Sequence, residues 1–166
     1  MSLEAPVLLD HRHDLDAFDC GVPPLDAWLK SRARSNAASG ASHTYVACDG
    51  LTVAGYYALA AGAVEVTAAP GKFRRNMPDP IPVIVLGRLA VATSHRGKGL
   101  GRALFRDSCL RVLQAADIIG VRGVLVDAIS GEAKAFYLAL GMTVSPLDPM
   151  TLMVTLGNLR ETVGRK

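Results

Sequence analysis

The chain has 166 residues, of which 50% are hydrophobic and 20% charged, and its formal net charge is +3. This length suits one domain with its own core, and the composition is typical of a globular protein rather than a disordered one. The apolar runs fall short of the ~20 residues that a membrane span requires, and residues 1–10 lack a signal-peptide pattern, so no membrane association is expected. The modest positive charge does not by itself indicate nucleic-acid binding.

The three cysteines are odd in number, widely spaced and form no Cys-x-x-Cys pair; they are Cys20, Cys48 and Cys109. Disulfide frameworks and zinc sites require pairs at close spacing. The sequence therefore predicts reduced thiols in a cytoplasmic protein, and no metal site.

In chain order, the first predicted element is a helix opened by Pro24, with Leu25, Trp28, Leu29 and Ala33 on one side. Two β-prone runs follow, residues 44–48 and 52–59, and the Asp-Gly pair between them predicts a hairpin. Residues 70–80 are rich in turn formers and charge, and the nearly continuous apolar runs 83–86 and 89–91 are typical of a buried strand.

The second half of the chain alternates helices and strands. A helix from Leu100 is followed by a strand at 124–126, and a further helix is capped by Ser130 and ends before Gly141. A last strand is expected at 150–156. The whole pattern predicts an α/β fold with a mixed sheet around a crossover helix, in one domain over residues 1–166. The helix from Leu100 is predicted to carry apolar residues on its inner side, namely Phe105, Cys109, Val112, Leu113 and Ala116.

A glycine-rich segment, Arg96-Gly97-Lys98-Gly99-Leu100-Gly101, lies between the central strand and the helix from Leu100. Glycines let a backbone approach a ligand and adopt positive φ, and the free N–H groups of a helix N-terminus bind pyrophosphate. Arg96, Lys98 and Arg102 add positive charge around such a ligand. The sequence therefore predicts a phosphate-binding loop, with a simple glycine turn as the alternative.

Two better-known nucleotide motifs do not fit this segment. A dinucleotide fingerprint has the spacing Gly-x-Gly-x-x-Gly, whereas the glycines here are 97, 99 and 101. A triphosphate loop requires Gly-Lys-Ser/Thr, and Lys98 is followed by Gly99.

The segment resembles the acetyl-coenzyme A motif of the GNAT superfamily, Arg/Gln-x-x-Gly-x-Gly/Ala. A second GNAT signature appears as Phe136-Tyr137-Leu138-Ala139-Leu140-Gly141-Met142, in which Met142 replaces the usual Phe. The resemblance implies the GNAT fold, an α/β mixed central sheet flanked by helices, and an acetyltransferase that uses acetyl-CoA. It places the cofactor against Leu89, Ala90, Val91, Arg96, Gly97, Lys98, Gly99, Leu100, Gly101 and Arg102.

A narrower resemblance covers nearly the whole chain. Segments such as Phe18-Asp19-Cys20-Gly21, Gly55-Tyr56-Tyr57-Ala58-Leu59 and Gly87-Arg88-Leu89-Ala90-Val91 resemble bacterial GNAT toxins of type II toxin–antitoxin systems. The resemblance implies acetylation of the α-amine of the amino acid on charged tRNA, which blocks translation. It also implies a homodimer, and neutralisation by a ribbon-helix-helix antitoxin.

Tyr137 is the candidate general acid. In many GNAT enzymes the tyrosine at this place protonates the departing thiolate, and a thiol of pKa near ~8.5 benefits from such a donor. An α-amine titrates near ~7.7–8.0, so a strong base is not essential. The helical spacing of Ala133, Phe136, Tyr137 and Leu140 leaves open that Tyr137 is only a core residue.

Basic residues are candidates for contact with a phosphate backbone, although a solvated surface explains such groups as often. Phe73 and Met77, which lie among them, could contact an exposed base. Arg88 either pairs within the protein or faces the acceptor end of the substrate. The candidates for tRNA contact are Lys30, Arg32, Arg34, Arg74, Arg75 and Arg88.

The main hypothesis is thus a toxin that acetylates aminoacyl-tRNA. One alternative is a GNAT enzyme for a protein terminus, a polyamine or a small antibiotic-like amine, which an acceptor site without Arg74 and Arg75 would favour. Another is a non-catalytic acyl-CoA-binding or partner-binding module, which would bind cofactor without turnover and be indifferent to Tyr137→Phe.

Overall fold

The structure is a computed structural model and describes residues 3–164. Its strands are β1 Val7–Leu8, β2 His43–Asp49, β3 Thr52–Val64, β4 Ile81–Val91, β5 Gly123–Asp127, β6 Thr143–Val144 and β7 Thr151–Thr155. Its helices are α1 Pro23–Ser31, α2 Ala33–Ser39, α3 Gly71–Arg74, α4 Leu100–Ala116, α5 Gly131–Ala139 and α6 Leu156–Gly164, with 3-10 turns η1 Val66–Ala68 and η2 Thr93–His95.

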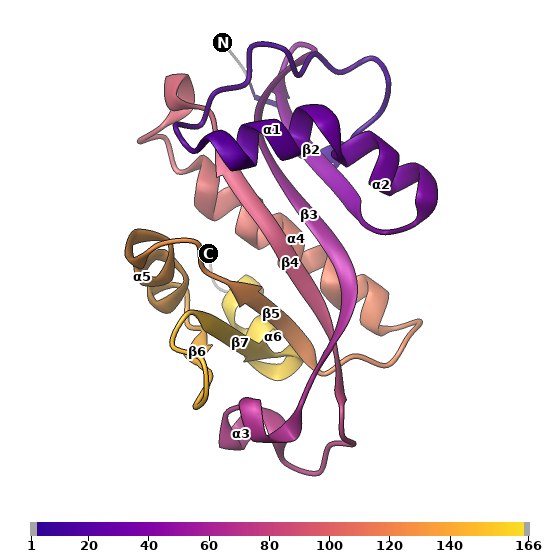
Figure 1. The fold of residues 1–166 in the computed structure, drawn as a ribbon, viewed down its shortest axis with the longest axis vertical. Coiled ribbons are helices and arrows are strands. Elements are labelled where there is room, and N and C mark those ends of the chain that lie inside the picture. The colour runs from indigo at the N-terminus through magenta and orange to yellow at the C-terminus, as the bar shows by residue number, and fades with distance from the viewer. Residues whose placement is uncertain (1–2, 165–166) are drawn as a thin grey trace. The chain divides into compact units, whose positions relative to one another are not determined.

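The strands form one sheet in the order β1-β2-β3-β4-β5-β7-β6 (Figure 1). β4 and β5 are parallel, whereas β1–β2, β2–β3, β5–β7 and β6–β7 are antiparallel. The predicted α/β class with a mixed sheet is therefore confirmed.

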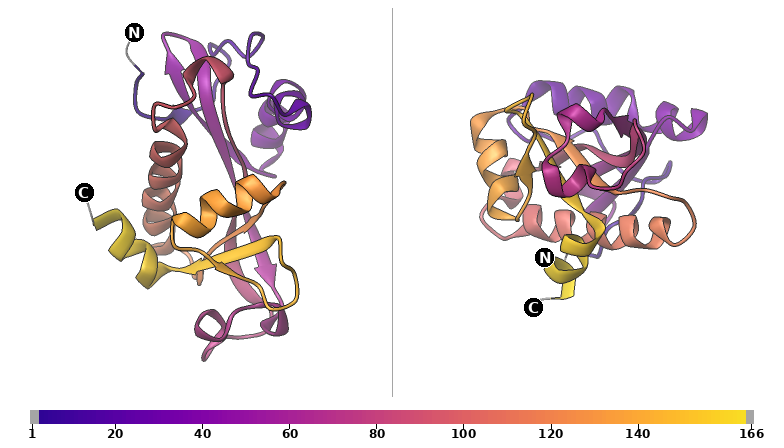
Figure 2. Two further views of the ribbon diagram at one scale, coloured as in Figure 1. Left: turned by 90° about the vertical axis from the view of Figure 1, so that its left-hand side faces the viewer. Right: turned by 90° about the horizontal axis from the view of Figure 1, so that it is seen from below.

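The chain forms two compact units. The first contains the residues up to Ala60 together with Gly87–Ser108, and the second contains Ala61–Leu86 together with the residues from Cys109 on. In the first unit, α1 and α2 cover one face of the β2–β3 hairpin and the first turns of α4 lie against the other (Figure 2, left). The predicted hairpin at Asp49-Gly50 is confirmed by the antiparallel register from His43↔Leu59 to Asp49↔Thr52.

The first predicted helix is in fact two helices. α1 ends at Ser31 and α2 starts at Ala33, because the backbone of Arg32 leaves the helical region at φ −121°, ψ −31°. The Ser31 hydroxyl donates to the Ala27 carbonyl at 2.6 Å, a back-bond of the kind that bends helices. Leu29 and Ala33 are nevertheless both fully buried, so the predicted apolar side is correct although the helix is broken.

The core of the second unit gathers residues from β3, β4, β5, β7 and the α3 region; it includes Val64, Ala69, Phe73, Ile81, Val83, Leu125 and Met153. The last strand is shorter than predicted, because the chain turns into α6 at Leu156. The helix α6 was not predicted. It buries Leu159, and a Leu-Gly-Asn start carries no strong helix signal.

The segment 70–80 contains a short helix, α3, rather than turns alone. Phe73 is only 2% exposed and belongs to the core of the second unit, with Met77 packed against the same cluster. The idea that Phe73 contacts an exposed base is therefore wrong. The Arg122 guanidinium donates to the carbonyls of Phe73 and Lys72, at 2.8 and 2.9 Å, and so satisfies the end of α3.

The three cysteines are buried and form no disulfide with one another, as predicted for structural thiols. Burial raises the pKa of Cys20 to about 11 and that of Cys48 to about 11. Within residues 3–164, no helix is long and apolar enough to cross a membrane. No group of three or more metal-ligating side chains occurs in that range either.

Candidate active site

The glycine loop joins the end of β4 to the start of α4. After Val91, the turn η2 leads to Gly97 and Gly99, whose φ angles are 77° and 78°. These left-handed conformations strain any residue except glycine. A Cβ built on either glycine would meet no atom within 4 Å, so the loop backbone borders open space. Gly101 lies inside α4 and has no positive φ.

The loop leads into the N-terminus of a 17-residue helix, α4. The Ala103 N–H donates to the Gly99 carbonyl at 3.1 Å, which marks the first turn. N–H groups of a first turn have no partner four residues earlier in the helix, and they lie at the positive end of its dipole. Lys98 and Arg102 are exposed beside this turn. The arrangement suits a pyrophosphate.

Arg96 is less available than the sequence suggested. Its guanidinium donates to the Cys20 carbonyl, in the segment just before α1. The two residues are 76 positions apart, so no local pattern predicts this contact. Arg96 therefore ties the glycine loop to the segment before α1. Lys98 and Arg102 are exposed as well, and no such contact to the backbone is found for them within residues 3–164.

At the end of β4, just before the loop, backbone groups rather than side chains are available to a ligand. Ala90 and Ala92 are 5% and 7% exposed and belong to the core cluster that includes Leu25 and Leu29. Any contact of Ala90 with a ligand must therefore come from its N–H or carbonyl. The backbone just after β4 is held against β3, since the Ala92 N–H donates to the Ala54 carbonyl at 2.8 Å.

A pocket of about 290 Å³ adjoins the glycine loop within the first unit. The predicted cofactor residues Lys98, Gly99 and Leu100 line one side of it, and the segment before β1 lines the other. The full lining is Leu3, Glu4, Ala5, Pro6, Ala47, Lys98, Gly99, Leu100 and Ala103.

Tyr137 lies in α5 of the second unit. Its helix begins as predicted: the Ser130 hydroxyl accepts from the Ala133 N–H at 3.1 Å. Gly141, just past the end, has φ 98°. Tyr137 is 6% exposed and packs edge-on against Phe136, with ring centroids 5.2 Å apart. Burial raises the pKa of Tyr137 to about 12, so its hydroxyl is protonated at neutral pH.

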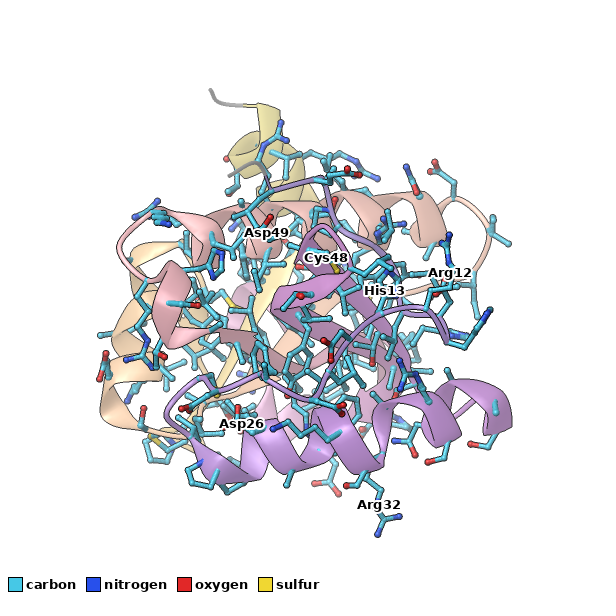
Figure 3. The ribbon with its side chains drawn as sticks, turned by 90° about the horizontal axis from the view of Figure 1, so that it is seen from above. Arg12, His13, Asp26, Arg32, Cys48 and Asp49 are labelled. Atoms are coloured by element: carbon cyan, nitrogen blue, oxygen red, sulfur yellow. The ribbon has the colours of Figure 1, made fainter. Side chains whose placement is uncertain are left out.

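The predicted tRNA contacts differ in availability. Lys30 and Arg32 are exposed on α1 and just after it, and Arg32 points away from the helices into solvent (Figure 3). The Arg34 guanidinium, by contrast, donates to the carbonyls of Asp10 and His13 at 3.2 and 2.7 Å. In the second unit, the predicted contacts Arg74 and Arg75 are both exposed.

Arg88 lies in the first unit over the ring of Trp28, with its guanidinium carbon 4.4 Å from the ring centroid. Trp28 in turn stacks on Tyr56, at 6.0 Å and an interplanar angle of 10°. The sequence predicted Trp28 only as part of an apolar helix face and gave Tyr56 no role. The stack joins α1 to two strands, so only the folded chain reveals it.

The larger of these two pockets, of about 520 Å³, lies in the second unit, and none of the predicted catalytic, cofactor-binding or tRNA-contact arginines and lysines lines it. Its lining is Met77, Pro82, Gly120, Val121, Arg122, Leu156, Gly157 and Arg160.

The profile of the acetyltransferase (GNAT) domain matches residues 40–143. The chain belongs to the GNAT acetyltransferase family. The match spans β2 to α5, and thus includes both the glycine loop and Tyr137. The GNAT fold, an enzyme of the acetyltransferase class and the family predicted from the two motifs are confirmed.

Three matches, to two different proteins, cover nearly the full length of the chain. A tRNA-acetylating toxin of Mycobacterium tuberculosis is 46% identical over 160 residues, which is 96% of each chain. The structure of AtaT complexed with acetyl-methionyl-tRNAfMet matches with a TM-score of 0.89 and 27% identity, over 96% of this chain and 98% of that one. A tyrosine-to-phenylalanine mutant of AtaT, bound to acetyl-CoA and the C-terminus of the antitoxin AtaR, matches with a TM-score of 0.84 and 25% identity, over 99% and 100%.

Proposed function

We propose that this chain is a toxin that transfers the acetyl group of acetyl-CoA to the α-amine of the amino acid on charged tRNA, and thereby blocks translation. The observation that carries the proposal is the 46% identity to a tRNA-acetylating toxin across 96% of both chains. An insertion or a missing element in a substrate-binding region would lower that coverage. The GNAT family match and the open glycine loop agree with the acetyl-CoA half of the reaction.

The glycine loop and the strand before it are the proposed cofactor site. Acetyl-CoA supplies the acetyl group as a thioester and carries a pyrophosphate. The N–H groups at Gly97–Gly101 and the charges of Lys98 and Arg102 would bind the pyrophosphate. Backbone groups of Leu89–Val91 would hold and polarise the thioester carbonyl, as an oxyanion-type contact. Fixed N–H donors cost no reorganisation when charge develops, which makes a strand end suitable for this task.

Tyr137 is the proposed general acid for the departing thiolate. With its pKa raised to about 12, the hydroxyl keeps its proton at every pH where an α-amine of pKa near ~7.7–8.0 becomes neutral. Because the thiol of the leaving group, with a pKa near ~8.5, is the stronger acid, Tyr137 would donate to the sulfur only while the C–S bond breaks and negative charge develops there. The proton that the attacking amine loses as the amide bond forms would pass through solvent and restore the Tyr137 hydroxyl. Its ring is held by burial and by Phe136.

Contacts with tRNA are assigned first to the exposed cations. Lys30, Arg32, Arg74 and Arg75 are free to follow a phosphate backbone. Arg34 has its guanidinium on two backbone carbonyls, so its contribution should be the smallest. Because charged tRNA is found in the cytoplasm, we place the protein there.

The two compact units would act together as one GNAT domain, since the family match crosses from one to the other. We further propose a homodimer and a ribbon-helix-helix antitoxin as partners. The antitoxin proposal is supported by the structure of the AtaT mutant with the C-terminus of AtaR.

The test is transfer of labelled acetyl from acetyl-CoA to bulk charged tRNA, with deacylated tRNA as the substrate control. Label on charged tRNA alone supports the proposal. Binding of acetyl-CoA without label on any charged tRNA, at enzyme concentrations that saturate the cofactor, would refute it and direct the search to protein or small-molecule amines. Tyr45→Phe serves as a matched control for Tyr137→Phe. It also removes one phenolic hydroxyl, but from a residue of β2 that stacks on Tyr57 and has no proposed role in the reaction.

A further inference from the structure

The stack of Tyr56, Trp28 and Arg88 in the first unit holds a guanidinium in a fixed place. Tyr56 is fully buried, and its hydroxyl donates to the Leu25 carbonyl at 2.7 Å. Trp28 lies parallel to it, and the Arg88 guanidinium carbon is 4.4 Å from the Trp28 ring centroid. Each layer restrains the next, so the guanidinium loses little freedom when it binds a ligand.

Arg88 differs from four other arginines in what its guanidinium contacts. Arg12 forms a 3.0 Å salt bridge with Asp10, and Arg34, Arg96 and Arg122 donate to backbone carbonyls. Among residues 3–164, no hydrogen bond or salt bridge to the Arg88 guanidinium is found. The side chain is half-buried. A partly desolvated cation without a protein acceptor favours an anionic ligand.

The position of Arg88 along β4 identifies which anion this would be. It directly precedes Leu89–Val91, the proposed contact for the acetyl thioester, and Ala90 and Ala92 point to the same face as Arg88 toward α1. The loop proposed for the cofactor pyrophosphate starts eight residues later, beyond β4 and η2. An anion at Arg88 therefore lies by the reacting end of the cofactor, where the 3′ end of the acceptor substrate must come. That end carries phosphodiesters, which the planar donor fork of arginine fits.

We propose that Arg88, held in place by Trp28, binds a backbone phosphate at the single-stranded 3′ end of the charged tRNA; this inference rests on the proposed function. Trp28 is a positioning residue that acts through Arg88. The rigid contact fixes the terminal nucleotide and with it the amine to be acetylated. The cofactor phosphates are the other source of the same chemistry, and the experiment must separate the two.

The experiment measures acetylation kinetics of Arg88→Met and Arg88→Lys in the full chain, with charged tRNA and with aminoacyl-adenosine, a probe that has the amine but no phosphate. For Arg88→Met we expect kcat/KM for charged tRNA to fall by about tenfold or more, with KM for acetyl-CoA within about twofold. Activity on aminoacyl-adenosine should not change. The slope of log KM against log salt concentration should decrease by about 0.7, the value for one phosphate contact on a single strand.

Further variants test whether tRNA binding requires the fixed position of the Arg88 guanidinium or only its positive charge. Arg88→Lys keeps the charge, so it should retain the salt slope but lose part of the affinity for tRNA. Trp28→Phe keeps an aromatic ring under Arg88 and should stay near wild type, whereas Trp28→Leu should resemble Arg88→Lys once thermal unfolding shows it to be folded. Arg12→Gln is the matched charge control, since its guanidinium already pairs with Asp10.

An unchanged salt slope in Arg88→Met, an equal loss on aminoacyl-adenosine, or a selective rise in KM for acetyl-CoA would each overturn the inference. Failure of the proposed function looks different: the wild-type chain would then acetylate no charged tRNA at all.

Discussion

The glycine loop after β4 is exposed and offers mainly its backbone, whereas Tyr137 of α5 is buried and offers a single hydroxyl. At the loop, φ angles of 77° and 78° and free space at Gly97 and Gly99 define the site. At Tyr137, burial sets both the position of the ring and the pKa of the hydroxyl. Binding of a large anion and donation of one proton thus depend on different physical properties. Substitutions should accordingly separate binding from turnover.

The largest effect is expected for Tyr137→Phe, which removes the hydroxyl and keeps the ring against Phe136. Loss of a general acid should lower kcat by about 10²- to 10⁴-fold with KM for acetyl-CoA nearly unchanged. Steady-state kinetics with charged tRNA measure this, with Tyr45→Phe as control. Wild-type kcat in Tyr137→Phe would mean that Tyr137 is only a core residue.

A smaller effect, on binding, is expected for Gly99→Ala. Alanine in a left-handed conformation costs about 1–2 kcal/mol, and a loop that relaxes to avoid this strain loses the backbone geometry for the pyrophosphate. KM for acetyl-CoA should rise by about tenfold, and kcat should change less.

Gly40→Ala is the matched control for that experiment. Gly40 has φ 82°, ends α2 and likewise has no atom within 4 Å of a built Cβ. Both variants should lose similar stability in urea unfolding, but only Gly99→Ala should lose affinity for acetyl-CoA in calorimetry. Equal losses of affinity in the two variants would show that the loss results from destabilisation of the protein in general and not from a change in the glycine loop.

A still smaller effect is expected for pH. The rate of acetylation should rise with pH to a plateau, without a fall at higher pH. Burial raises the pKa of Tyr137 to about 12, so the neutral donor form persists as pH rises through the physiological range. The rate on charged tRNA should therefore increase severalfold between about pH 7 and 8.5, as the α-amine loses its proton, and then level off. A fall in kcat before the amine is fully neutral, after correction for ester hydrolysis, would contradict a protonated Tyr137.

The smallest effect is expected at the cap that starts α5. Ser130→Ala removes the acceptor for the Ala133 N–H and should lower the free energy of unfolding by about 1 kcal/mol. Ser39→Ala, in which the lost hydroxyl donates to the Asn36 carbonyl at the end of α2, should cost less. If Tyr137 is positioned by burial rather than by the cap, kcat of the Ser130 variant should stay within about twofold of wild type.

The features that the sequence predicts well are those encoded locally. Ser130, Gly141 and the Asp49-Gly50 pair each require one backbone geometry, and the structure has all of them. Gly97 and Gly99 belong to the same class, which is why the loop could be placed correctly between a strand and a helix.

The features that the sequence does not predict depend on distant partners. The acceptors for Arg34 lie 24 and 21 residues away, and the acceptor for Arg96 lies 76 residues away. Every residue has a backbone carbonyl, so the residue type does not reveal which one accepts a hydrogen bond. The arginines Arg34, Arg88 and Arg96 therefore cannot be told apart from the sequence. Only the fold distinguishes the one that rests on Trp28.

The buried thiols determine how the protein can be labelled. Cys20 and Cys48, each with a pKa of about 11, are thiolates at neutral pH in only about one molecule in 10⁴, and thiolates are the form that maleimides and iodoacetamide attack. Cys109 is fully buried. A cysteine introduced at an exposed position such as Ser35 would react far ahead of all three. A single fluorophore or spin label can therefore be attached to the folded protein with its native cysteines left in place.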